Sequence, residues 1–222
     1  MSRLGVIVLA AGRSTRFSGG EAGGPHKLLA RVGGSTVVHR SVQAAVDSDV
    51  GPVVVVTGAA SAEVATALAG LAVRTVHAPA FAEGMATSLR RGLETLDGMV
   101  DAVLIALGDQ PGVRPDAYRR VAARWSEARA AIVMPRYAGS AAPAHPTLFD
   151  RLVFDELRAL RGDVGARAVI ARDASRVVTV PLEWPAPSDV DTADDLIRVV
   201  GELSDGATES VGERSSRSSD SA

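Results

Sequence analysis

The fold of this chain is decided near its start, where residues 5–17 read GVIVLAAGRSTRF. A near-continuous apolar run of this kind is typical of a strand that is buried on both faces of a sheet. The run ends in Ala-Ala-Gly, and two arginines follow within the next four residues. The stretch therefore predicts a buried strand that ends in a turn of small residues beside two permanent cations.

The rest of the chain alternates between short apolar runs and longer amphipathic patterns. The apolar runs predict strands at 4–10, 52–58, 72–78, 101–107, 130–135 and 176–182. The amphipathic patterns predict helices at 36–48, 61–71, 85–96, 115–129, 150–160, 165–173 and 192–203. Strands that alternate with helices predict a mostly parallel, doubly wound sheet, so we expect a Rossmann-like three-layer α/β/α domain.

Length and composition bound the organisation of the chain. Its 222 residues, of which 46% are hydrophobic, are enough for one substantial domain. We predict that this domain spans residues 1–203 and that the Ser-rich segment 204–222, with one branched apolar residue, is a disordered tail. The first apolar run is too short for a membrane span and continues into the strand–helix pattern, so we expect a cytoplasmic protein.

Several function classes are excluded or disfavoured by composition. The chain has no cysteine, which excludes disulfides, zinc–thiolate sites, iron–sulfur clusters and cysteine nucleophiles. A net charge of −2 and an aromatic content of 4% argue against nucleic-acid binding. No serine lies in a G-x-S-x-G motif, which argues against a serine hydrolase.

The loop after the first strand is the first candidate site, because ligands of parallel α/β sheets bind beyond the carboxyl ends of the strands. Gly12 lets backbone N–H groups approach a ligand, and Arg13, Arg16 and Lys27 supply cations, so the loop suits a polyphosphate. The glycine spacing matches neither a Walker A loop nor the G-x-G-x-x-G fingerprint of NAD(P) enzymes. The alternative is a solvated surface loop.

Two acidic loops are the other candidates. Asp109 follows a strongly hydrophobic strand, and residues 189–196 read DVDTADDL at the start of the last helix. Each carboxylate could simply cap a helix or turn, with Asp191 or Thr192 as the N-cap. Asp109 and Asp191 could instead hold one Mg²⁺ between them, since Mg²⁺ takes one or two carboxylates plus substrate phosphates. His145, between two prolines, is either part of an extended turn or a substrate contact.

These loops belong to a set of stretches that resemble one known family. The stretches are VIVLAAGRSTRF (6–17), HKLL (26–29), GMATSLRRGL (84–93), LGDQP (107–111), HPTLFDRLVFDELRALRGDVGAR (145–167) and DVDTADDL (189–196). Together they resemble the MobA-like nucleotidyltransferases, and within that family the molybdenum cofactor cytidylyltransferases. The similarity is collinear and implies the sheet of the nucleotide-diphospho-sugar transferase type.

The resemblance also implies roles for individual residues. The nucleotide would be bound by Leu9, Ala10, Ala11, Gly12, Arg13, Ser14, Arg16, Lys27, Gly84 and Ser88. Arg16, Lys27 and Asp109 would be catalytic, Asp109 and Asp191 would hold Mg²⁺, and His145 and Pro146 would contact the acceptor.

The implied reaction is transfer of CMP from CTP to the phosphate of molybdopterin, with release of pyrophosphate. Partners would be the nucleoside triphosphate, the molybdopterin-like acceptor and a molybdoenzyme or its chaperone, with no nucleic acid or membrane. Three alternatives stay open: the use of GTP, a different phosphorylated acceptor, and a non-catalytic relative that binds a nucleotide or cofactor.

Overall fold

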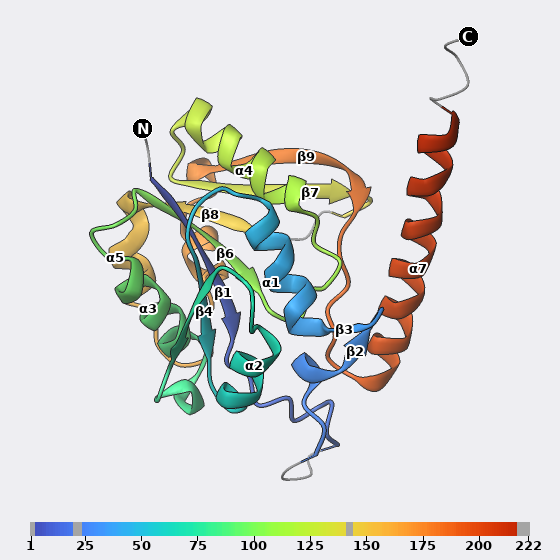
Figure 1. Ribbon diagram of the computed structural model, residues 1–222. Helices are drawn as coiled ribbons and strands as arrows, with labels where there is room; N and C mark the ends of the chain where they lie inside the picture. The colour runs from blue at the N-terminus through green and yellow to red at the C-terminus, as the bar shows by residue number, and fades with distance from the viewer. Residues whose placement is uncertain (1–2, 20–23, 141–143, 217–222) are drawn as a thin grey trace.

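One seven-stranded sheet forms the centre of the molecule in the computed structural model, which describes residues 3–19, 24–140 and 144–216 (Figure 1). The strand order is β5-β4-β1-β6-β8-β7-β9. The strands are β1 (Leu4–Ala10), β4 (Val53–Thr57), β5 (Val73–His77), β6 (Ala102–Leu107), β7 (Ile132–Ala138), β8 (Thr147–Asp150) and β9 (Val177–Pro185). All neighbouring strands are parallel except β8, which is antiparallel to β6 and β7. The predicted mostly parallel α/β sheet is therefore confirmed.

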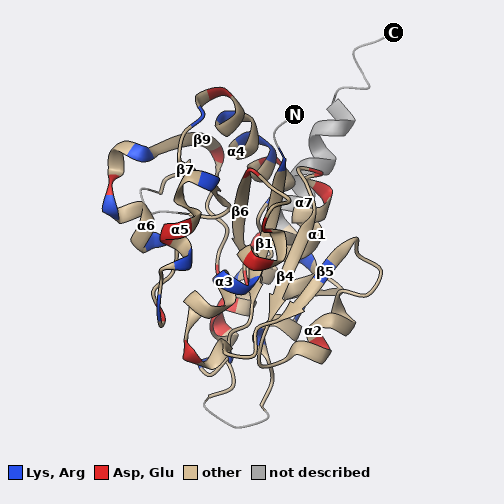
Figure 2. Cartoon of the chain, turned by 90° about the vertical axis from the view of Figure 1, so that its left-hand side faces the viewer, with Lys and Arg blue, Asp and Glu red and all other residues tan. Residues whose placement is uncertain are grey.

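Seven helices cover both faces of this sheet within the described residues. They are α1 (Val37–Asp47), α2 (Ser61–Ala67), α3 (Met85–Leu96), α4 (Pro115–Ala128), α5 (Phe154–Arg158), α6 (Arg167–Arg172) and α7 (Ala193–Ser216). One core cluster packs α1, α2, α4 and α7 on one face, and a second packs α3, α5 and α6 on the other. Figure 2 shows α5 and α6 on the left of the sheet and α1 and α2 on the right.

The first strand shows why its sequence is apolar on both sides. Side chains alternate across a strand, so Val6 and Val8 enter the first core cluster while Ile7 enters the second. All three are fully buried. Because β1 pairs with β4 on one side and with β6 on the other, it is an interior strand of the sheet.

Two short elements differ from the expected pattern. β8 was not predicted, because its four residues directly precede a helical pattern and are too few to show a period. A hairpin of β2 (Arg31–Val32) and β3 (Ser35–Thr36) was also not predicted. Its turn residues Gly33 and Gly34 have φ of +56° and +81°, the left-handed conformation that glycine adopts freely in two-residue hairpin turns.

The last helix extends beyond the expected end of the domain. Backbone helix continues in α7 through Ser216, although a disordered tail was predicted from residue 204. Extending a helix that has already formed costs much less than starting one, so a polar continuation can stay helical. Residues 217–222 of the predicted tail lie outside the described residues, and the domain boundary at 203 stays a prediction. None of the described helices combines the length and apolarity that crossing a bilayer requires.

The connections place a topological switch point beside β1. From β1 the chain moves to β4 and β5 on one side, and then returns to β6 on the other side of β1. A crevice opens where two such halves diverge, at the carboxyl ends of the strands. The loops after β1 and β6 therefore face each other across this crevice.

Candidate active site

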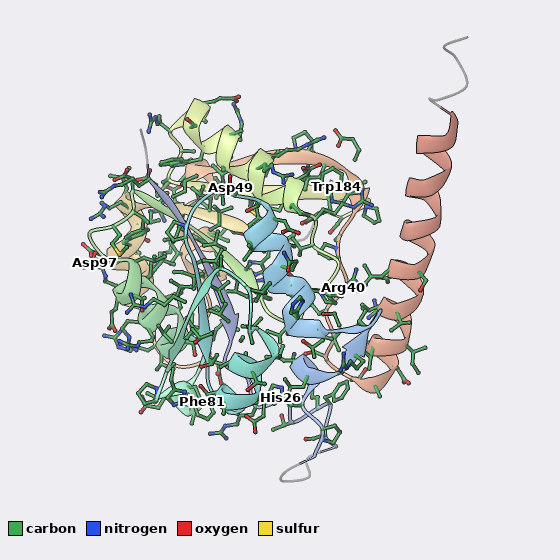
Figure 3. All side chains as sticks on the ribbon, viewed as in Figure 1. His26, Arg40, Asp49, Phe81, Asp97 and Trp184 are labelled. Carbon is green, nitrogen blue, oxygen red and sulfur yellow. The ribbon has the colours of Figure 1, made fainter. Side chains whose placement is uncertain are left out.

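A cavity of about 850 Å³ lies at the switch point. Its lining includes nearly all of the residues predicted to bind the nucleotide, metal and acceptor: Leu9, Ala10, Ala11, Gly12, Arg13, Ser14, Arg16, Lys27, Gly84, Ser88, Asp109, His145 and Asp191. Figure 3 shows His26 and Phe81 at this end of the sheet. The structure thus brings together side chains from the first loop, α3, the loop after β6 and the segment before α7.

The loop after β1 is held by hydrogen bonds that bridge its Gly-rich insert. Ser14 has φ of +59°, and its hydroxyl accepts a hydrogen bond of 2.8 Å from the backbone N–H of Lys27. Nε2 of His26 lies 3.1 Å from the carbonyl oxygen of Gly12 and donates to it. Lys27 is therefore anchored beside the end of β1, although the insert separates it from Arg16 in the sequence. Residues 20–23 of the insert lie outside the described residues.

Four charged side chains meet in the cavity. Nζ of Lys27 donates to Oδ2 of Asp109 at 2.6 Å and to Oδ1 of Asp191 at 2.7 Å. The Nη1 atom of Arg16 lies 2.8 Å from Oδ2 of Asp191. Two carboxylates that are far apart in the sequence therefore share one ammonium group, and one of them also pairs with a guanidinium.

Two further hydrogen bonds hold the carboxylate loops together. The backbone N–H of Val190 donates to the carbonyl oxygen of Asp109 at 3.0 Å. The side-chain amide of Gln110 donates to Oδ1 of Asp189 at 2.5 Å. These bonds hold the loop after β6 against the segment before α7, so Asp109 and Asp191 are kept close together.

Burial strengthens the coupling within this cluster. It raises the pKa of Asp109, and Lys27 offsets only part of that effect. Burial alone would lower the pKa of Lys27, but the carboxylates of Asp109 and Asp191 outweigh it and raise that pKa. The lysine therefore stays protonated and carries its charge at the centre of the site.

The donor set fits a divalent cation that prefers oxygen ligands. Oδ1 of Asp109 is buried and has no hydrogen-bond partner among the described residues, which leaves a carboxylate oxygen free to bind a ligand. In the described part of the chain, no three His, Cys, Asp or Glu residues form a metal-binding group. Two carboxylates alone suit Mg²⁺, which completes its shell with water and substrate phosphates. Asp109 and Asp191 would hold such an ion.

Capping of α7 does not account for Asp191. The hydroxyl of Thr192 accepts from the backbone N–H of Asp195, whose carboxylate accepts from the N–H of Thr192 in return. Hydrogen bonds from Thr192 and Arg198 lower the pKa of Asp195 to about 2. Because this reciprocal pair caps the helix, the carboxylate of Asp191 is available to the cavity.

The opposite wall of the cavity is built by the start of α3 and the loop before α6. Gly84 precedes α3 with φ of +119°, and the N–H of Ala86 donates to the carbonyl of Gly162 at 3.1 Å. A Cβ atom on Gly84 would lie 2.2 Å from the carbonyl carbon of Gly162, so only glycine allows this approach. Ser88, one helical turn on, is buried and lines the cavity.

His145 lines the cavity as a neutral imidazole. Burial lowers its pKa, and its Nδ1 atom lies 3.1 Å from the carbonyl oxygen of Ile105. A carbonyl oxygen only accepts, so Nδ1 carries the proton and Nε2 is an acceptor. Pro146, predicted to contact the acceptor together with His145, is buried and does not line the cavity.

Family membership agrees with this geometry. The family model of the MobA-like NTP transferase domain matches residues 6–177. The chain belongs to this family. MobA-like NTP transferases are nucleotidyltransferases, and the cavity of this one lies at the switch point of its sheet.

Solved structures of similar proteins support the assignment. Rv0371c from Mycobacterium tuberculosis is 30% identical, with 90% of this chain and 98% of that chain covered and a TM-score of 0.79. A structure of the same mycobacterial protein in complex with manganese is 28% identical over 90% of this chain and 99% of that chain, with a TM-score of 0.74. A Methanothermobacter nucleotidyl transferase is 28% identical over 90% and 97%, with a TM-score of 0.76.

Among the cavity residues of this MobA-like chain that were not predicted, Phe81 and Arg167 bear most directly on ligand binding. Phe81 lines the cavity and lies under the guanidinium of Arg13. The Cζ atom of Arg13 is 5.9 Å from the centroid of the Phe81 ring. Arg167 also lines it, is exposed, and has no hydrogen-bond or ion-pair partner among the described residues. Arg167 is the last residue of GDVGAR, one of the stretches that resemble the family. The sequence therefore contained the motif but did not indicate that Arg167 lines the cavity.

Proposed function

We propose that this protein transfers CMP from CTP to the phosphate of a molybdopterin-like acceptor, in a Mg²⁺-dependent reaction that releases pyrophosphate. The observation that carries this proposal is the meeting of Arg16, Lys27, Asp109 and Asp191 at one end of the cavity. Two cations and two carboxylates in one crevice suit a polyphosphate and its metal ion.

The chemistry needs no covalent intermediate on the protein. An oxygen of the acceptor phosphate attacks the α-phosphorus of the triphosphate, and the bond from that phosphorus to the bridging oxygen of the β-phosphate breaks. Pyrophosphate leaves with the bonding electrons. When bound, the metal ion supplies Lewis-acid stabilisation of the charge that builds on the phosphates.

The residues of the chain supply binding and charge. Arg16, which is mostly exposed, can grip phosphate oxygens in a bidentate manner, and Lys27 supplies a point charge. Ala10, Ala11 and Gly12 line the cavity, and an added Cβ at Gly12 would meet nothing within 4 Å, so the space beside this backbone is open to the nucleotide. Ser88 has a buried hydroxyl at the cavity wall for the base.

The acceptor side of the cavity requires a cation of its own. His145 is neutral, and Lys27 and Arg16 are assigned to the triphosphate. Arg167 is an exposed guanidinium on the wall beside His145 with no carboxylate partner in the described chain. We assign it to the phosphate of the acceptor. A molybdoenzyme or its chaperone as recipient of the product, and a cytoplasmic location, stay predictions.

The direct test is pyrophosphate release with purified molybdopterin and each of CTP, GTP, ATP and UTP in Mg²⁺ buffer. We expect release with CTP and a thermal stabilisation by CTP that the other nucleotides do not match. Preference for GTP would replace the cytidylyl assignment by a guanylyl one. Nucleotide binding without pyrophosphate release from any triphosphate would contradict an enzymatic role.

Substitution of Arg167 tests the acceptor assignment. We expect Arg167→Gln to raise KM for the acceptor by about 10- to 100-fold, because one charge-assisted hydrogen bond to phosphate is lost, while KM for CTP stays unchanged. The matched control is Arg172→Gln on the same helix, since Arg172 pairs with Glu156 at 3.0 Å. An equal rise in both KM values for Arg167→Gln would remove the residue from the acceptor site.

A further inference from the structure

The ammonium group of Lys27 occupies the space between the two carboxylates that would hold the metal. It lies 2.6 Å from Oδ2 of Asp109 and 2.7 Å from Oδ1 of Asp191. The lysine side chain is only 14% exposed, so water does not compete strongly for these contacts. A cation between the carboxylates is therefore already provided by the chain itself.

The residue type at this position is exceptional in the chain. Of the 24 basic residues, 23 are arginines and Lys27 is the single lysine. A guanidinium is planar and spreads its charge over a wide fork, whereas an ammonium is a compact point charge with three donors. Only the ammonium has the size and charge distribution of a small ion that can fit between two carboxylates of different loops.

We propose that Lys27 is the resident counter-ion of Asp109 and Asp191, and that it moves onto the phosphates when the metal and the triphosphate bind together. The inference rests on the proposed metal and triphosphate site. It assigns the lysine a second role beside phosphate binding, which is to exclude the metal ion until the nucleotide arrives.

The local structure permits this movement. The backbone of Lys27 is anchored by the hydroxyl of Ser14, and the following turn is closed by Leu29 N–H donating to the carbonyl of His26 at 2.9 Å. The four-carbon side chain can therefore change direction while its backbone stays in place.

The consequence is coupling between metal and nucleotide. A metal ion alone would displace a buried ammonium and leave its charge without a partner, which is costly. Phosphate oxygens give the displaced ammonium new partners, so the nucleotide raises the affinity for metal. By thermodynamic linkage, the metal raises the affinity for nucleotide by the same factor.

The single lysine makes the movement directly observable. Labelling with ¹³C,¹⁵N-lysine yields one side-chain resonance set, which reports the surroundings of Nζ by NMR. We expect Mg²⁺ alone, at millimolar concentration, to leave these resonances in place and Mg²⁺ with CTP to shift them. A shift of the same size with Mg²⁺ alone, or an unmoved signal with bound CTP and Mg²⁺, would overturn the inference.

Binding of Mn²⁺ without nucleotide provides a second readout, measured by electron paramagnetic resonance. Lys27→Met removes the competing charge, so we expect its affinity for Mn²⁺ to rise by about tenfold or more, the scale of a charge-assisted hydrogen bond. Lys27→Arg keeps a cation beside the carboxylates, and we expect no rise. The control Arg120→Met also removes one positive charge, from a pair with Glu183 remote from the cavity, and should leave Mn²⁺ affinity unchanged.

The two proposals fail in different ways. The first outcome is that calorimetry detects binding of CTP with Mg²⁺ while Lys27→Met and the unmodified protein have equal affinities for Mn²⁺. This outcome overturns the counter-ion role and leaves the proposed function in place. Absence of nucleotide binding for all four triphosphates overturns both.

Discussion

Asp109→Asn should reduce pyrophosphate release by about 1,000-fold or more while the protein still folds. The amide keeps the shape of the side chain but removes the negative charge that pairs with Lys27 and that would hold the proposed metal ion. Oδ1 of Asp109 is buried without a partner among the described residues, which leaves this oxygen available to a ligand. The measurement is the single-turnover rate at saturating CTP and Mg²⁺, with thermal melting alongside.

The matched control is Asp194→Asn, because Asp194 is exposed in the first turn of α7 and does not line the cavity. It removes the same charge a few residues from Asp191, and activity should stay near that of the unmodified protein. Normal turnover by Asp109→Asn in Mg²⁺ buffer would remove Asp109 from the metal site. A collapse of its melting transition would show a structural role instead, since Lys27 retains Asp191 as a partner.

Gly84→Ala should destabilise the protein by about 3 kcal/mol or more and disturb the wall of the cavity. The backbone of Gly84 has φ of +119° and ψ of +172°, a conformation that other residues adopt only at a cost of about 1–3 kcal/mol. The added methyl would also lie 2.2 Å from a backbone carbon of Gly162, and such overpacking costs a further ~1–3 kcal/mol. For a chain of this size, the melting temperature should fall by about 6–12 °C.

Gly70→Ala separates the two causes. Gly70 has φ of +90°, but an added Cβ there would meet nothing within 4 Å. It should lose only the conformational part, about 1–2 kcal/mol. Equal losses of stability for the two variants would show that the close approach of Gly84 to Gly162 does not contribute to the effect of Gly84→Ala.

The elements with a strong internal period were predictable from the sequence. The strand at 4–10 and the helix at 85–96 have the bounds expected, since each carries its own apolar pattern. β8 was missed because four residues show no period, and its antiparallel pairing depends on strands β6 and β7. The hydrogen bonds that make it a strand come from residues distant in the sequence.

For the candidate site, the motifs indicated which residues to examine but not how they interact. The contact of Lys27 with both Asp109 and Asp191 was not expected, and the predicted role of Lys27 at the triphosphate stays a prediction. Pro146 was expected at the acceptor, whereas it is buried and does not line the cavity, although its neighbours His145 and Thr147 do. Arg167 ends the GDVGAR motif, but the motif alone did not indicate that this cation lines the cavity.

The sequence by itself determined the alternation of strands and helices, the absence of cysteine chemistry and the small, cationic loop that follows the first strand. These features depend only on residues that are close together in the sequence, because hydrophobic periodicity and local backbone freedom determine them. Only the tertiary structure decided that Lys27 meets carboxylates 82 and 164 positions away. That contact depends on strand order, because the return of the chain to β6 beside β1 brings the three loops to one edge of the sheet.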